Sequence, residues 1–302
     1  MLVLPEISDI TYFTSDSENL GRSSNDHNNK IRENIITSMP HIDEDYFSDP
    51  IHGEFWHKLK TDFDNKIRII CPHYISYKIQ HKAGRGHNYD YIITFYDEVN
   101  SKISEEKLEF KFNASSIDEA PQFVSPMKPS QYLSQPFEEY YYDNYLVPLL
   151  KEFDLDIPER NLYLKSVHNN KPKCMEIAQL FYYQGCKQSS KYTGSEQAIK
   201  FYQRCNDVSR ECIKNFINNT ELNIDKLNQY LMNSQDKKNY ILYKNGEFYI
   251  QTSNNDDYTI VSCSKNPEKS RYEAETKTNK KIHILLRWKN GNGIAYPAFQ
   301  IS

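Results

Sequence analysis

Two strand-like segments, residues 91–96 and 107–112, constrain the fold of this chain more than any other part of the sequence. Each is rich in β-branched or aromatic residues, and a polar connection of a composition typical of turns separates them. Side chains alternate between the two faces of a strand, so Glu109 and Lys111 point away from the apolar residues that flank them. We therefore expect an antiparallel hairpin with one face in the core.

The acidic residue that precedes this hairpin, Asp90, is expected to lie close to Glu109 and Lys111. Antiparallel pairing places the start of the first strand beside the end of the second. Carboxylate oxygens are the ligands that Mg²⁺ prefers, and an ammonium group beside them can orient water and offset negative charge. The predicted chemistry is the hydrolysis of a phosphodiester, with Mg²⁺ as cofactor and Mn²⁺ as its substitute.

An Asp followed about twenty residues later by Glu-x-Lys resembles the motif of the PD-(D/E)xK nuclease superfamily, which includes restriction endonucleases. The resemblance covers roughly residues 51–131, and Tyr89 stands where many members have proline. It implies a DNA endonuclease with Asp90, Glu109 and Lys111 as catalytic residues and Asp90 and Glu109 as metal ligands. It also implies products with 5′-phosphate and 3′-hydroxyl ends.

In that superfamily a helix ahead of the first core strand often supplies another metal-binding glutamate. Residues 51–64 predict such a helix, with apolar side chains at helical spacing. By this resemblance Glu54 is the first candidate for a third metal ligand, and Glu33 is the second. Either carboxylate could instead lie on a solvated helix face.

Basic residues near the proposed site and in the second half of the chain are the candidates for DNA binding. The segment before Asp90 contains two glycines with Lys82 and Arg85, which suits a close approach to phosphate. Residues 1–150 carry 14 Lys and Arg against 24 Asp and Glu, whereas residues 151–302 carry 23 against 17. We therefore expect phosphate contacts from the second half as well, from Arg287 and Lys289.

The same resemblance implies a restriction-endonuclease-like α/β fold, in which helices flank a mixed sheet. Residues 1–135 would form the N-terminal part of the nuclease core with the catalytic hairpin, residues 136–239 a helical insertion, and residues 240–302 a β-rich C-terminal segment completing the core. The final stretch, LLRWKNGNGIAYPAFQIS, is similar in part to the ends of nuclease-like proteins of large DNA viruses and of some restriction-type enzymes.

Cysteine usage and hydropathy predict a protein of a reducing compartment. The six cysteines show no CxxC pair or histidine spacing of a zinc site, and no segment approaches the ~20 apolar residues of a membrane span. We expect an intracellular protein without membrane contact, in cytoplasm or nucleus or carried in a virion. Cutting both DNA strands would call for a homodimer.

Two other functions are consistent with the same residues. One is an RNA endonuclease of the cap-snatching type, in which an upstream histidine joins the metal site; the candidates are His57, His81 and His87. The other is a non-catalytic protein that uses the fold to bind nucleic acid. A preference for Mn²⁺ and cleavage of single-stranded RNA would favour the first alternative.

Overall fold

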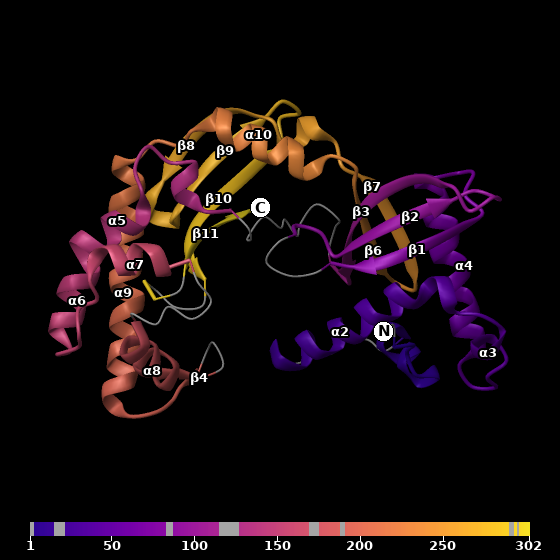
Figure 1. The fold of residues 1–302 in the computed structure, drawn as a ribbon, viewed down its shortest axis with the longest axis horizontal. Helices are drawn as coiled ribbons and strands as arrows, with labels where there is room; N and C mark the ends of the chain where they lie inside the picture. The colour runs from indigo at the N-terminus through magenta and orange to yellow at the C-terminus, as the bar shows by residue number, and fades with distance from the viewer. Residues whose placement is uncertain are drawn as a thin grey trace. The chain divides into compact units, whose positions relative to one another are not determined.

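The computed structural model divides the chain into two compact units, each described separately below (Figure 1). It describes residues 3–14, 22–82, 87–114, 127–168, 175–187, 191–289, 293–294 and 296–302. Unit 1 comprises Met1–Ala120 and Ser234–Asn255, and unit 2 comprises Pro121–Asn233 and Asp256–Ser302. Unit 2 thus consists of two separate stretches of the sequence, and Ser234–Asn255 between them belongs to unit 1.

Unit 1 is built on a five-stranded mixed sheet, as the sequence predicts. The strand order is β1-β2-β3-β6-β7, and every pair is antiparallel except β3 and β6. Parallel neighbours need a long crossover, and here the first part of unit 2 provides it. The strands are β1 (Ser76–His81), β2 (Tyr91–Tyr96), β3 (Lys102–Phe112), β6 (Lys238–Lys244) and β7 (Glu247–Thr252).

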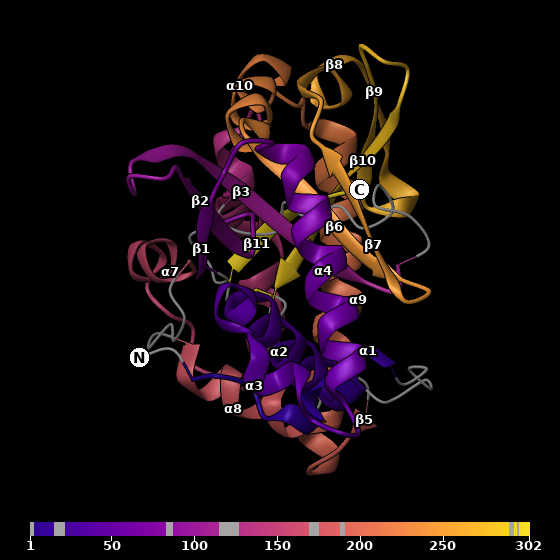
Figure 2. The ribbon, with the colours of Figure 1, turned by 90° about the vertical axis from the view of Figure 1, so that its right-hand side faces the viewer.

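Two long helices, α2 (Arg22–Ser38) and α4 (Gly53–Ile70), bury their apolar sides in the core of unit 1. α2 packs near β1 and α4 packs on β7, and Figure 2 shows α4 crossing the sheet. α4 extends past the predicted end at residue 64 because Ile67 continues the buried stripe of Trp56 and Phe63. Short helical segments complete the N-terminal part: Ile7–Ile10, α1 (Thr11–Thr14), Met39–His41 and α3 (Glu44–Phe47).

The predicted hairpin is present as β2 and β3. Asp97 closes its turn by accepting hydrogen bonds from the backbone of Val99 and Ser101 at 3.0 and 2.8 Å, and Asn100 adopts the left-handed conformation there. β3 begins at Lys102, five residues before the predicted start, because its polar first half also pairs with β2. The hairpin is therefore longer than its apolar pattern indicates.

Unit 2 contains the predicted helical segment. A π-helical turn at Tyr142–Leu146 joins two of its helices, and the Oγ atom of Ser195 caps the longest one by accepting from the Ala198 backbone at 3.2 Å. The helices are α5 (Phe137–Tyr141), α6 (Val147–Glu152), α7 (Arg160–Ser166), α8 (Glu176–Gly185), α9 (Glu196–Asn219) and α10 (Ile224–Gln235), with a short turn at Pro129–Gln131 and the two-residue strands β4 (Cys186–Lys187) and β5 (Lys191–Tyr192).

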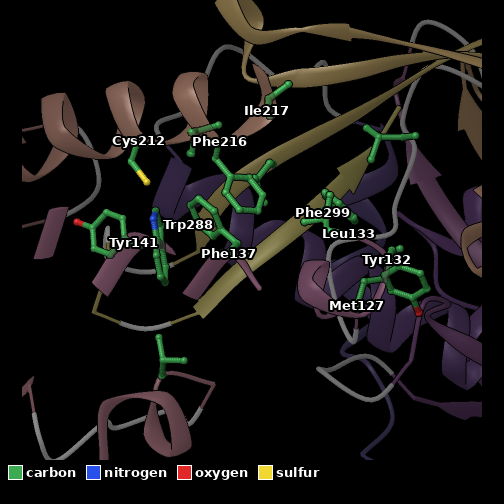
Figure 3. Packing of buried hydrophobic residues seen from close by; sticks show 14 of the residues in the cluster. Met127, Tyr132, Leu133, Phe137, Tyr141, Cys212, Phe216, Ile217, Trp288 and Phe299 are labelled. Atoms are coloured by element: carbon green, nitrogen blue, oxygen red, sulfur yellow. The ribbon is translucent and has the colours of Figure 1, made fainter. Parts of the chain in front are cut away.

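A second sheet, in the order β11-β10-β9-β8 and antiparallel throughout, packs with these helices. Figure 3 shows the packing around Trp288, whose ring centroid lies 5.5 Å from that of Phe137 and 5.0 Å from that of Tyr141. Phe216 of α9 meets Phe137 edge-on at 4.9 Å. The strands are β8 (Ile260–Asn266), β9 (Arg271–Thr276), β10 (Lys281–Lys289) and β11 (Tyr296–Ile301), with short helical turns at Asn255–Tyr258 and Pro267–Lys269.

The β-rich C-terminal segment contributes strands to both units rather than to a single core. β6 and β7 complete the sheet of unit 1, whereas β8 to β11 form the separate sheet of unit 2. Strand periodicity shows that a segment is extended and does not show which sheet it joins, so the predicted divisions after residues 135 and 239 differ from those of the structure. Within the described residues, none of the helices has the length and hydrophobicity needed to cross a membrane.

Candidate active site

Asp90 ends the β2–β3 ladder. The last paired residue of β2 at this end is Tyr91, which lies opposite Leu108. The Asp90 backbone N–H still donates to the Leu108 carbonyl at 3.0 Å, but the next bond comes from its side chain: Oδ2 accepts from the Phe110 backbone N–H at 2.9 Å. The carboxylate thus replaces a main-chain acceptor and is held at the edge of β3.

Glu109 lies on β3 between two lysines. The Lys111 ammonium donates to Oε1 at 2.6 Å, and the Lys238 ammonium lies 3.2 Å from Oε2. The Glu109 side chain is 6% exposed, that of Lys111 12% and that of Lys238 0%. Burying a carboxylate this deeply is costly unless it is paired, and here each oxygen has its own lysine partner.

Lys238 is a residue of the site that sequence reasoning missed. It begins β6 and pairs in register with Lys107, so its side chain shares a face of the sheet with Glu109. Its Nζ atom also donates to the carbonyl of Asn88, two residues before Asp90. No local pattern marks it, because the parallel β3–β6 pairing joins segments on either side of the insertion.

Burial and mutual repulsion shift the protonation equilibria of these groups. The pKa of Asp90 is raised to about 7, first by burial and then by the charge of Glu109, although the Phe110 N–H and Lys111 oppose the shift. Burial lowers the pKa of Lys238, while Glu109 opposes that shift. Two carboxylates that disfavour each other's charge are a feature of sites that receive a cation.

A third carboxylate near these residues comes from Glu33 of α2, the second of the two candidates. Its Oε2 lies 3.2 Å from Nε2 of His81, and burial raises its pKa, with the charge of Glu109 adding to the effect. The hydroxyl of Tyr91 also donates to the Glu33 carbonyl at 3.4 Å. α2 therefore connects directly to the start of β2, where Asp90 lies.

The first candidate, Glu54, does not join this group. It is exposed in the first turn of α4, and no described contact links it to Asp90 or Glu109. The physical reason is the placement of the helices: α4 packs on β7 at the far edge of the sheet, whereas α2 packs near β1. The spacing of apolar residues predicts a helix but not the edge of the sheet that it covers.

The predicted DNA-binding residues lie in both units. Lys82 is adjacent to the site, and its backbone N–H donates to the Asp90 carbonyl at 2.7 Å. Arg287 is exposed on β10 of unit 2 and donates to Oε1 of Gln300 at 2.7 Å. Arg85 and the side chain of Lys289 lie outside the described residues.

The chemistry of the donors fits a hard divalent cation. Asp90 and Glu109 supply carboxylate oxygens and Glu33 adds negative charge nearby. As the side chains stand, no three His, Cys, Asp or Glu residues of the described part form a metal-binding group. Mg²⁺ usually takes only one or two carboxylates and completes its shell with water and substrate phosphate, so this sparse donor set is compatible with it.

Comparison with protein-family models finds no match to the chain, and a search of curated proteins finds no relative of it.

Proposed function

We propose that unit 1 is a metal-dependent nuclease that hydrolyses phosphodiester bonds of DNA, as the resemblance to the PD-(D/E)xK superfamily implies. The observation that supports this most directly is a largely buried group in which burial, and then the charge of Glu109, raise the pKa of Asp90, while Lys111 donates to Glu109 at 2.6 Å. A surface strand with alternating charges would have solvated side chains, whereas this group is largely buried.

The residues divide into distinct roles. Asp90 and Glu109 would hold Mg²⁺, or Mn²⁺ in its place, and the bound ion would supply Lewis-acid stabilisation and a more acidic water. Lys111, the more exposed of the two lysines, would orient the attacking water and offset charge on the phosphate. Lys82 and Arg85, with Arg287 and Lys289 of unit 2, would contact the DNA backbone.

A cleavage assay tests the proposal. Supercoiled and linear DNA would be incubated with the full chain in Mg²⁺, Mn²⁺ or EDTA, and the product ends would be identified by ligation and end-labelling. We expect cleavage with either ion, 5′-phosphate ends, and a loss of about 10²-fold or more in Asp90→Asn, Glu109→Gln and Lys111→Met. Lys102→Met is the matched control, because Lys102 lies on the same strand and is exposed beside Glu105.

DNA binding without cleavage in any metal would contradict the proposal and favour the non-catalytic alternative. Sedimentation of the chain with and without DNA would also show whether cutting depends on a homodimer.

The RNA endonuclease alternative gains one observation from the structure. All three candidate histidines are exposed, and they differ in their neighbours. Nε2 of His81 lies 3.2 Å from Oε2 of Glu33, whereas the ring of His87 lies 5.1 Å from that of Tyr89 and that of His57 lies 5.2 Å from that of Phe47. Cleavage of single-stranded RNA in preference to DNA, with a requirement for Mn²⁺, would favour this second function. His81→Ala should then remove the requirement for Mn²⁺, and His87→Ala should leave it intact.

A further inference from the structure

A cavity of about 540 Å³ in unit 1 lies apart from the carboxylates. Its walls come from α1, α4, the ends of β3 and β6, and the β6–β7 turn; Asp90, Glu109 and Lys111 do not line it. The volume is within the range of small-molecule sites. The cavity also lies at the carboxyl ends of the parallel pair β3 and β6, the edge at which α/β sheets commonly bind ligands.

The charge of the lining favours an anion. Lys58 of α4 and Lys244 of β6 are the cationic residues of the lining, and no Asp or Glu occurs among the described lining residues. Lys244 lies opposite Glu247 in the β6–β7 ladder. Within the described part of the chain Lys58 forms no ion pair. Asp62, one helical turn further on, is engaged elsewhere: its Oδ2 accepts from the Phe248 backbone N–H at 2.5 Å, and its Oδ1 lies 4.0 Å from Nζ of Lys66.

The Lys58 ammonium lies beside the turn between β6 and β7. Asn245 and Gly246 both adopt left-handed backbone conformations, with φ of 54° and 82°. A Cβ atom added at Gly246 would lie 3.8 Å from Nζ of Lys58. That distance is an ordinary contact, so the positive φ of the hairpin turn accounts for the glycine, and the Lys58 ammonium lies beside this turn.

Part of the lining is aromatic. Phe55 lies one turn before Lys58 on α4 and is 50% exposed. Phe13 and Tyr243 form a buried, edge-on pair with ring centroids 4.9 Å apart. An exposed ring offers a surface on which a flat base can stack, and stacking of this kind is tolerant of base identity.

We propose that this cavity binds a nucleoside phosphate, with the phosphate at Lys58 and Lys244 and the base against Phe55. The ligand is a free nucleotide or the terminal nucleotide of a strand, which share this chemistry. The inference concerns a second site and does not depend on nuclease activity.

Isothermal titration of the full chain in EDTA tests the inference, with AMP, adenosine, inorganic phosphate and the dinucleotide pTpT as probes. AMP should bind saturably. Adenosine or phosphate alone should bind at least about tenfold more weakly, because adenosine has no phosphate for the lysines and phosphate has no base for Phe55. Lys58→Ala and Phe55→Ala should each weaken AMP binding by about five- to tenfold. Lys66→Ala, on the same helix but outside the lining, should bind AMP like the wild type.

Tighter binding of AMP than of pTpT would identify a free nucleotide as the ligand, and the reverse would identify a strand end. Melting curves of each variant would establish that the fold is intact. Absence of saturable AMP binding at about 10 mM, or wild-type affinity in both Lys58→Ala and Phe55→Ala, would overturn the inference. Cleavage by the Asp90 site would be unaffected by either result, so the two proposals fail separately.

Discussion

The Nζ atom of Lys238 lies 3.2 Å from Oε2 of Glu109, and neither side chain is more than 6% exposed. A buried charge is costly unless it is paired, so each residue stabilises the charged form of the other. The pair also connects β6 to β3 beside Asp90, since Lys238 donates to the carbonyl of Asn88. Proper assembly of the candidate site thus depends on a residue on the far side of the insertion.

Lys238→Met should lower the free energy of unfolding by about 3 kcal/mol, because it leaves Glu109 with one ammonium and Asn88 without its donor. Urea unfolding followed by circular dichroism measures the change. Lys102→Met, at an exposed position of β3, should change the same quantity by less than about 0.5 kcal/mol. Equal stability of the two variants would mean that the Lys238–Glu109 pair contributes nothing.

Asp90→Asn should abolish cleavage and stabilise the metal-free protein at alkaline pH. The folded-state pKa of about 7 exceeds the value of about 4 for an unfolded aspartate, so ionising Asp90 disfavours the folded state. The contribution of Asp90 to the free energy of unfolding is therefore fully present below pH 4, and it is lost as the pH rises through 7. The asparagine of the variant does not ionise, so the variant keeps this stability at high pH. At pH 8 it should be more stable than the wild type by roughly 2 kcal/mol, after allowance for partial exposure.

Denaturation in EDTA at pH 4 and pH 8 measures that difference, which should nearly vanish at the lower pH. A variant that retains cleavage and is less stable at pH 8 would show that Asp90 has a structural role instead. Glu54→Gln provides an exposed carboxylate as the control.

The hairpin and the Asp90, Glu109 and Lys111 group could be predicted because they depend on local pattern. Alternation fixes the face of each side chain, and a short connection fixes the antiparallel register. Lys238 could not be found in this way, and Glu33 is only the second candidate, behind Glu54. The position of Lys238 depends on the parallel pairing of β3 with β6 across the insertion. The position of Glu33 depends on which edge of the sheet α2 covers.

Glu33→Gln should weaken the binding of Mn²⁺ by about three- to tenfold, since it removes a negative charge close to Glu109. Glu54→Gln should leave the affinity unchanged. Isothermal titration with Mn²⁺ compares the two variants directly. A larger effect of Glu54→Gln would restore the helix α4 as the source of the third carboxylate.

DNA binding in Ca²⁺, which generally supports little cleavage, should weaken steeply with salt, and Arg287→Ala with Lys289→Ala should make the dependence shallower. Log K should fall by ~0.9 per phosphate neutralised, so loss of two contacts should reduce the slope by about 1.8. Fluorescence anisotropy over a range of salt concentrations measures this slope. If the double variant keeps the wild-type slope, β10 does not face the DNA, and Lys200 and Arg204 of α9 become the residues to test.

Anomalous diffraction from a crystal soaked in Mn²⁺ tests the central claim most directly. Both Asp90 and Glu109 should have a carboxylate oxygen about 2.0–2.2 Å from a single anomalous peak, with the Lys111 ammonium displaced from Oε1 of Glu109 or retained beside it. A peak at saturating Mn²⁺ that lies elsewhere, or its absence between these two carboxylates, would contradict the assignment of this group as a metal-dependent active site.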